Sequence, residues 1–172
     1  MDRRTYLATA AAGVALPALA GCIGDLETAS ESRTVDALDG DASLAVATRN
    51  GDVTVVGEDR ADGFLRVTKR TWRGVDLDRV SVAVRTTDGT VHLEPDVPDD
   101  VPRGAVTLDV DLRVPASVAV QGVDTANGTI QLRDVAGDPE LTSTNGDVDA
   151  RDVVGRVHAE TTNGDVTLRG TD

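Results

Sequence analysis

An Asn-Gly pair that returns at a fixed interval constrains the fold of this 172-residue chain more than any other feature. Each pair precedes a short segment in which two apolar residues alternate with polar ones. Glycine lacks a Cβ and asparagine tolerates positive φ, so the pair predicts a tight turn. The alternation predicts a half-buried strand after the turn. The three pairs are Asn127 and Gly128, Asn145 and Gly146, and Asn163 and Gly164.

Two related turns occur earlier in the chain. Asn50 and Gly51 form the first, and Asp88 and Gly89 form the second. The spacing from each of these turns to the next is roughly two repeats with an insertion. No helical period is present after residue 21, so the repeats predict an all-β domain over residues 36–172.

Two all-β architectures fit this pattern. In a single-stranded, right-handed β-solenoid (β-helix), each repeat of about 18 residues is one coil, and equivalent residues stack about 4.8 Å apart. Asn127, Asn145 and Asn163 would then form a hydrogen-bonded ladder. In the alternative, an antiparallel β-sandwich, each pair closes a hairpin. The strict period favours the solenoid, and a chain with only 2% aromatic residues suits its small stacked side chains.

The segment over residues 1–22 predicts export and lipid attachment. Arg3 and Arg4 precede a short uncharged stretch, a pattern that resembles a twin-arginine signal. Residues 19–22 look like a lipobox whose last residue, Cys22, is the only cysteine of the chain. We therefore expect a signal peptide over residues 1–21 and a lipid-anchored, flexible tether over residues 22–35. The mature protein would lie on the outer face of the cytoplasmic membrane, with lipid on Cys22.

The charge balance narrows the function classes. The formal net charge is −13, which argues against a nucleic-acid partner because binding phosphates needs a positive surface. The chain has 24 Asp and 6 Glu against 16 Arg and 1 Lys, a composition typical of halophilic proteins. Such a surface stays hydrated at molar salt.

Individual polar residues point to structural roles rather than to a catalytic, cofactor or metal site. His92 and His158 fall at unmatched repeat positions, so we expect both at the solvent-exposed surface. The turn aspartates could bind Ca²⁺ in a stack, but turn solvation explains them better, since threonine replaces them in two copies. These turn aspartates are Asp52, Asp147 and Asp165.

One basic cluster and one pair of carboxylates remain. The basic residues around Trp72 could recognise an acidic glycan or a partner, although pairing with acidic neighbours on adjacent strands is favoured. Asp109 and Asp111 share a strand face, as the carboxylates of a glycan-cleaving β-helix would, but no aromatic residue lies nearby in the sequence. The basic cluster consists of Arg66, Lys69, Arg70 and Arg73.

The Thr-x-Asn-Gly-Asp-Val repeats, with Val114 and Pro115 upstream, resemble the putative-adhesin family of unknown function, from about Asp36 to the end. The resemblance implies single-stranded β-helices, often membrane-attached, with no catalytic residues. Accordingly, we expect a non-enzymatic surface lipoprotein that binds, adheres or scaffolds in the envelope, with a surface protein or glycan as partner. The alternatives are a polysaccharide-acting enzyme on the same fold and an accessory subunit of a membrane complex.

Overall fold

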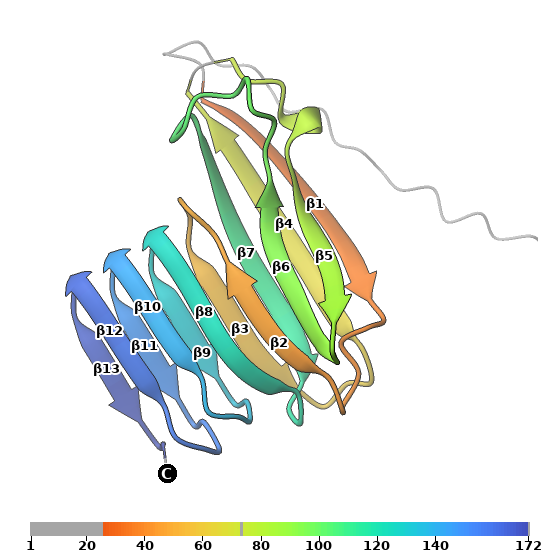
Figure 1. The fold of residues 1–172 in the computed structure, drawn as a ribbon, viewed down its shortest axis with the longest axis vertical. Helices are drawn as coiled ribbons and strands as arrows, with labels where there is room; N and C mark the ends of the chain where they lie inside the picture. Colours follow the sequence, from red (N-terminus) through yellow and green to blue (C-terminus); the bar gives the residue numbers. More distant parts are fainter. Residues whose placement is uncertain (1–25, 73, 172) are drawn as a thin grey trace, which may run out of the picture.

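The computed structural model describes residues 26–72 and 74–171, which fold into β-strands joined by turns and one short 3₁₀ helix (Figure 1). The elements are β1 (Glu27–Val35), β2 (Ser43–Ala47), β3 (Val53–Glu58), β4 (Gly63–Thr71), η1 (Leu77–Arg79), β5 (Ser81–Thr87), β6 (Thr90–Asp96), β7 (Val106–Pro115), β8 (Ala119–Asn127), β9 (Ile130–Arg133), β10 (Glu140–Asn145), β11 (Val148–Arg151), β12 (His158–Asn163) and β13 (Val166–Arg169). The all-β prediction is confirmed.

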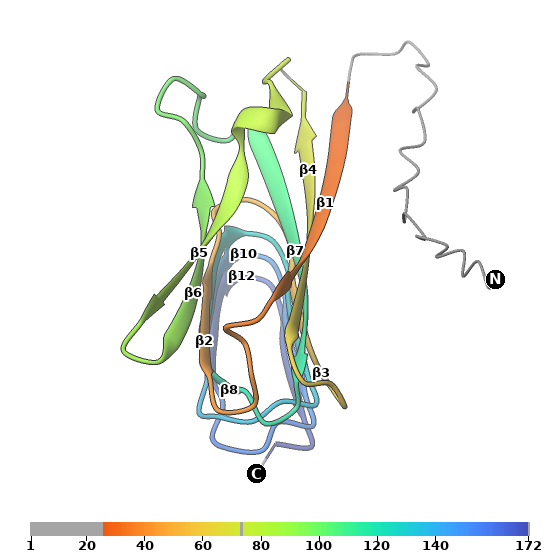
Figure 2. The same cartoon turned by 90° about the vertical axis from the view of Figure 1, so that its right-hand side faces the viewer.

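The strands form two mixed sheets that face each other (Figure 2). The seven-stranded sheet has the order β1-β4-β7-β3-β9-β11-β13, and the six-stranded sheet has the order β12-β10-β8-β2-β6-β5. Side chains that point between the sheets are almost all aliphatic and fully buried, whereas Trp72 is 71% exposed. The core therefore depends on small side chains at repeated positions, as the composition predicts.

The three C-terminal repeats stack as coils. Each coil gives one strand to each sheet, and every strand pairs in parallel with its equivalent in the next coil. Val148, for example, lies in register with Ile130 on one side and with Val166 on the other. We name the coils by their turn residue: the Asn127 coil (β8 and β9), the Asn145 coil (β10 and β11) and the Asn163 coil (β12 and β13).

A fourth coil comes from much earlier in the chain. Strands β2 and β3, which flank Asn50, pair in parallel with β8 and β9 and so stack against the Asn127 coil. On their other side, β2 and β3 pair in parallel with β6 and β7. This Asn50 coil therefore joins the C-terminal repeats to the N-terminal part of the molecule.

The N-terminal part is antiparallel, so the prediction of one solenoid over residues 36–172 is wrong there. Strand β4 pairs antiparallel with β1 and β7, and β5 pairs antiparallel with β6. The pair Asp88 and Gly89 closes the β5–β6 hairpin, with φ values of 50° and 77°. Positive φ at both turn residues reverses the chain within one sheet, so this turn does not lead into a coil. The right-handed coil sense stays a prediction.

The expected tether over residues 22–35 is also wrong for most of its length. Strand β1 covers nine of those residues and pairs with β4 along its whole length, so main-chain hydrogen bonds hold it although its side chains are mostly exposed. The predicted signal peptide and its residues Arg3, Arg4 and Cys22 lie outside the described residues. Among residues 26–72 and 74–171, no helix is long and apolar enough to cross a membrane.

Candidate binding surface

The turn asparagines form a hydrogen-bonded ladder along one edge of the stack. The Nδ2 atom of Asn163 donates to Oδ1 of Asn145 at 2.9 Å, and Nδ2 of Asn145 donates to Oδ1 of Asn127 at 2.8 Å. The series continues from Asn127 to Asn50 at 2.7 Å, although these two residues are far apart in the sequence. The predicted ladder is confirmed, and it has one more member than the C-terminal repeats alone indicate.

The glycines after these asparagines allow the close stacking. A Cβ on Gly128 would lie 2.0 Å from the carbonyl oxygen of Gly51, and one on Gly146 would lie 2.1 Å from that of Gly128. The φ angles of Gly128 and Gly146 are 157° and 150°. Glycine is therefore required at these positions both by the backbone conformation and by the distance between coils.

The turn aspartates tie each coil to the next. Oδ1 of Asp52 accepts the main-chain N–H of Thr129 at 2.8 Å, and Oδ1 of Asp147 accepts that of Asp165 at 2.9 Å. These bonds give Asp52 and Asp147 a structural role beyond the solvation that the sequence favours. Within the described part of the chain, no group of three or more metal-ligating side chains forms a metal site.

A row of arginines crosses the outer face of the seven-stranded sheet. Arg133, Arg151 and Arg169 lie in register on β9, β11 and β13, so neighbouring guanidinium groups start from positions about 4.8 Å apart. We call these three residues the arginine row. Arg133 is half-buried, and its Nε has no hydrogen-bond partner. Arg169 is exposed and forms no salt bridge with any described residue.

One carboxylate lies within the arginine row. Asp149 accepts two hydrogen bonds from Arg151, at 2.8 Å from Nε and 2.5 Å from Nη2. This pairing, together with the charges of Arg133 and Arg169, holds the pKa of Asp149 below its usual value, although burial opposes the shift. Asp149 is hydrogen-bonded within the row and Asp152 also acts on the charge of Arg151, so two carboxylates offset part of the three positive charges.

Arginines closer to the N-terminal strands of the same face are paired more completely. Arg113 contacts Glu58 at 2.5 Å and Asp111 at 3.5 Å, and Arg70 forms an ion pair with Asp109. Asp109 and Asp111, considered above as glycan-cleaving carboxylates, are therefore both engaged by arginines. On this face, Arg66 of β4 and Arg169 of the last coil are exposed and form no salt bridge with any described residue.

The expected cluster around Trp72 is divided between two environments. Lys69 points into the space between the sheets, where its side chain is 6% exposed and Nζ lies 2.9 Å from Glu31. Arg66 and Arg70 point to the opposite side of β4, because side chains alternate along a strand. The pairing of basic residues with acidic neighbours is confirmed for Lys69 and Arg70, and Arg73 lies outside the described residues.

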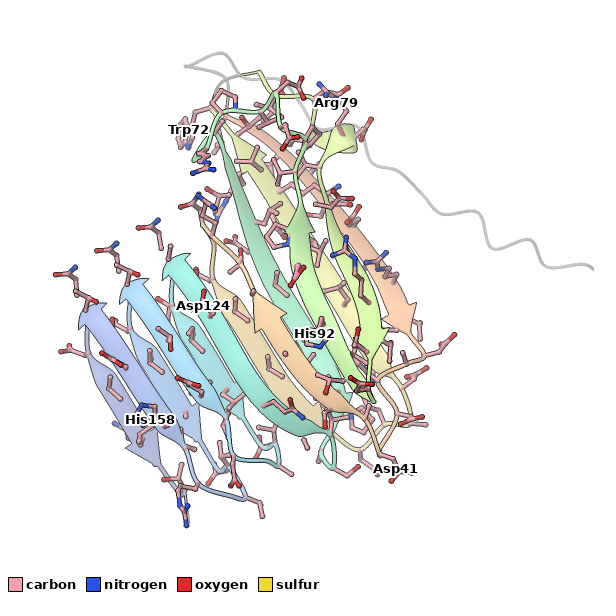
Figure 3. All side chains as sticks on the ribbon, viewed as in Figure 1. Asp41, Trp72, Arg79, His92, Asp124 and His158 are labelled. Atoms are coloured by element: carbon pink, nitrogen blue, oxygen red, sulfur yellow. The ribbon has the colours of Figure 1, made fainter. Side chains whose placement is uncertain are left out.

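The outer face of the six-stranded sheet has the opposite character. A shallow groove of about 380 Å³ crosses it where Ala45, Ala47 and Gly122 leave room between taller side chains. Exposed carboxylates line the groove, together with His92. Figure 3 shows His92 and His158 on different strands of this sheet, with β2, β8 and β10 between them. The structure thus does not bring the two histidines together. The carboxylates are Glu94, Asp124 and Glu140.

The arginine row was not singled out in the sequence. An arginine follows the second apolar residue of each C-terminal repeat, at the same distance from the turn asparagine each time. That spacing is a readable signal, because equivalent positions of a stacked coil share one face. The turn residues are the easiest part of the repeat to recognise in the sequence. In the structure, however, their side chains hold the coils together.

The model of one protein family, described as Toastrack DUF4097, matches residues 31–172. A search of curated proteins finds no relative by sequence. Among solved structures, a putative cell adhesion protein from Clostridium sporogenes covers 85% of this chain and 100% of its own length, at 7% identity and a TM-score of 0.50. A putative adhesin from Bacteroides fragilis covers 85% of this chain and 97% of its own, at 11% identity and a TM-score of 0.36.

Proposed function

The chain belongs to the Toastrack DUF4097 family, and on this premise we propose that it is an exported, lipid-anchored and non-enzymatic binding module of the cell envelope. Its binding surface is the arginine row of the C-terminal coils. Its ligand is an extended polyanion with regularly spaced carboxylates, such as an acidic surface polysaccharide or an acidic glycan of a surface protein.

The observation that carries this proposal is the placement of three arginines in one row on a protein of net charge −13. A surface adapted only to solubility would carry carboxylates there, as the opposite sheet does. Guanidinium groups bind carboxylates through two parallel hydrogen bonds, which are stronger and more directional than a lysine contact. Arg169 is exposed and forms no salt bridge with any described residue, so the row has a guanidinium group available to a ligand.

The regular spacing favours a linear ligand over a compact one. Successive guanidinium groups are offered at the inter-strand distance, and a flexible polymer can place one anionic group against each. Each contact alone is weak at high salt, because exposed charges are screened within about 3 Å at 1 M. Several linked contacts compensate for that screening, which is an advantage of a repeated surface.

The export and anchoring part of the proposal depends on Arg3, Arg4 and Cys22. Two acyl chains on Cys22 would hold the protein firmly, since each buried CH₂ contributes about 0.8 kcal/mol. Strand β1 begins at Glu27, only a few residues later, so the folded domain would follow the anchor almost directly. A Cys22→Ser variant should be released from membranes, and a variant that stays fully membrane-bound would contradict lipidation.

A titration tests the binding surface. The full chain with Cys22→Ser is titrated calorimetrically with oligogalacturonate, at low salt and again at molar salt. Changing Arg133, Arg151 and Arg169 together to Gln should weaken binding at least about tenfold. The control changes three arginines outside the row to Gln and so alters the net charge equally. Those arginines are Arg79, Arg85 and Arg156.

The control triple should weaken binding by less than about threefold. Equal losses of affinity in the two triple variants would show that binding depends only on the net charge, and would contradict the proposal. The oligosaccharide should also be recovered at its original length, because the module binds without cleaving. Shortened products would favour the polysaccharide-acting enzyme, and a single co-purified membrane protein would favour the accessory subunit.

A further inference from the structure

We propose that the pocket at the Asn50 end of the asparagine ladder binds a small amphiphile with a monoanionic oxygen head, such as a carboxylate or phosphodiester, on an apolar chain. Residues of the turn after β2 and of the long loop that joins β6 to β7 line the pocket, and its volume is about 540 Å³. That volume is within the range of small-molecule sites, about 300–1,000 Å³.

The ladder has a fixed direction that points its donors toward this pocket. Nδ2 of Asn145 donates to the carbonyl of Ala126 at 3.4 Å, and Nδ2 of Asn163 donates to that of Thr144 at 3.4 Å. A carbonyl can only accept, so each amide nitrogen must face the preceding coil.

The first member of the ladder has no coil of its kind before it. Oδ1 of Asn50 accepts from Asn127, which leaves its Nδ2 on the opposite side, and Asn50 lines the pocket. In residues 26–72 and 74–171, no protein group accepts a hydrogen bond from that Nδ2. The pocket is therefore lined by an unpaired amide donor, which stands at the end of a chain of hydrogen bonds that polarise one another.

A second donor points to the same ligand. In the repeats, a hydroxyl two positions before the asparagine donates to the glycine carbonyl of the preceding coil, as Ser143 does to Gly128 at 3.0 Å and Thr161 to Gly146 at 2.8 Å. Thr48 occupies this position in the Asn50 coil. It is only 7% exposed, yet its Oγ1 has no hydrogen-bond partner, and it lines the pocket. A buried hydroxyl without a partner in its own fold calls for one from a ligand.

The remaining lining defines both parts of that ligand. Arg49 and Arg103 add positive charge, and the exposed carboxylates of Glu94 and Asp99 balance it. The two unpaired donors and the two arginines favour an anionic oxygen head. The two carboxylates disfavour a head that carries several negative charges. The apolar lining suits an attached hydrocarbon chain. That lining includes Val97, Val101, Val106 and Leu108.

Octanoate is a suitable probe of this chemistry. Octyl glucoside, which lacks the charge, and acetate, which lacks the long apolar chain, are the control compounds. The full chain with Cys22→Ser should bind octanoate at least tenfold more tightly than either control compound. Thr48→Val should weaken octanoate binding at least about tenfold. The same substitution should leave the melting temperature of the free protein unchanged or higher, because it removes an unpaired buried hydroxyl. Ser143→Ala, which removes a paired hydroxyl in the repeats, should leave octanoate binding within twofold.

Vesicles of phosphatidylglycerol distinguish a lipid headgroup from a free amphiphile. Sedimentation with vesicles that Thr48→Val abolishes would assign the site to a membrane lipid, and binding of octanoate without vesicle binding would assign it to a soluble anion. Equal affinity for octyl glucoside, or octanoate binding unchanged by Thr48→Val, would overturn the inference. The inference does not depend on the arginine row, so its triple Gln variant should bind octanoate like the wild type.

Discussion

The C-terminal coils and the N-terminal antiparallel strands share two sheets but are stabilised in different ways. In the coils, equivalent residues lie above one another: the ladder asparagines bond to each other, glycine carbonyls accept from hydroxyl groups of the next coil, and turn aspartates accept main-chain N–H groups of the next coil. In the N-terminal part, no such columns occur among the described residues, and a long hairpin and loops replace the short turns. Stacking of equivalent residues makes the coils regular. The N-terminal part lacks this stacking, and its loops leave room for a pocket.

One repeat motif can serve both stability and binding. Inward and turn positions hold the coils together, which leaves the outward position at the end of β9, β11 and β13 available for the arginine row. Where the repeat stops, at the Asn50 coil, the same donors remain without partners. The most specific chemistry therefore lies at the end of the regular region rather than inside it.

The largest expected effect separates the two kinds of glycine turn. Gly128→Ala would place a Cβ 2.0 Å from the Gly51 carbonyl oxygen of the Asn50 coil and should lower the free energy of unfolding by at least about 4 kcal/mol. Gly89→Ala, in the hairpin, meets no atom within 4 Å and should cost only about 1 kcal/mol for its positive φ. Urea unfolding measures both, and similar losses would contradict the close stacking of the coils.

A second prediction compares a residue of an inner coil with its equivalent in the last coil of the stack. Leu132 and Leu168 hold the same repeat position, but Leu132 is fully buried and Leu168 is 42% exposed at the last coil. Leu132→Ala should therefore cost about 3 kcal/mol, and Leu168→Ala less than about 1 kcal/mol. Equal costs for the two variants would show that the Asn163 coil is covered in solution.

The ladder gives a smaller and graded effect. Asn127→Ala removes one ladder bond to each neighbouring coil and should cost about 1–2 kcal/mol. Asn163→Ala removes one ladder bond and the longer bond to the Thr144 carbonyl at the exposed end of the stack, and it should cost less, about 1 kcal/mol. Both variants can be compared by urea midpoint. A larger loss for Asn163 than for Asn127 would contradict a ladder of equivalent members.

The smallest effect concerns pH. The pKa of Asp149 is lowered in the folded state by its hydrogen bonds with Arg151, so the pair stabilises the fold fully above the unfolded carboxyl pKa of about 3.9. This contribution is lost as the pH falls from there through the lower folded pKa. Asp149→Asn should accordingly make the urea midpoint less dependent on pH below about pH 4, and Arg151→Gln should do the same. An unchanged pH dependence in both variants would show that the pair contributes nothing.

The sequence predicts the coils well because their physics is local and repeated. The positions of Ile130, Val148 and Val166 follow directly from the constant repeat period and the strand alternation. The N-terminal part could not be predicted in this way. Asp88 and Gly89 resemble a coil turn in composition, but their two positive φ angles, which decide the topology, are not visible in the residue types.

The order of the expected tether and the presence of the pocket could not be predicted from the sequence either. Strand β1 has almost no buried side chains, so its order comes from main-chain bonds to β4, which no sequence pattern indicates. The missing partner of Thr48 arises because a long loop stands where a glycine turn would otherwise lie, and this follows only from the three-dimensional stacking. The arginine row, by contrast, was present in the repeat spacing.

The most direct test of the binding surface is to follow the arginine Nε–H signals by NMR during titration with oligogalacturonate. The account predicts that the signals of Arg133, Arg151 and Arg169 shift together and saturate, while those of Arg79 and Arg85 stay in place. Shifts spread evenly over all arginines, or confined to residues outside the row, would contradict it.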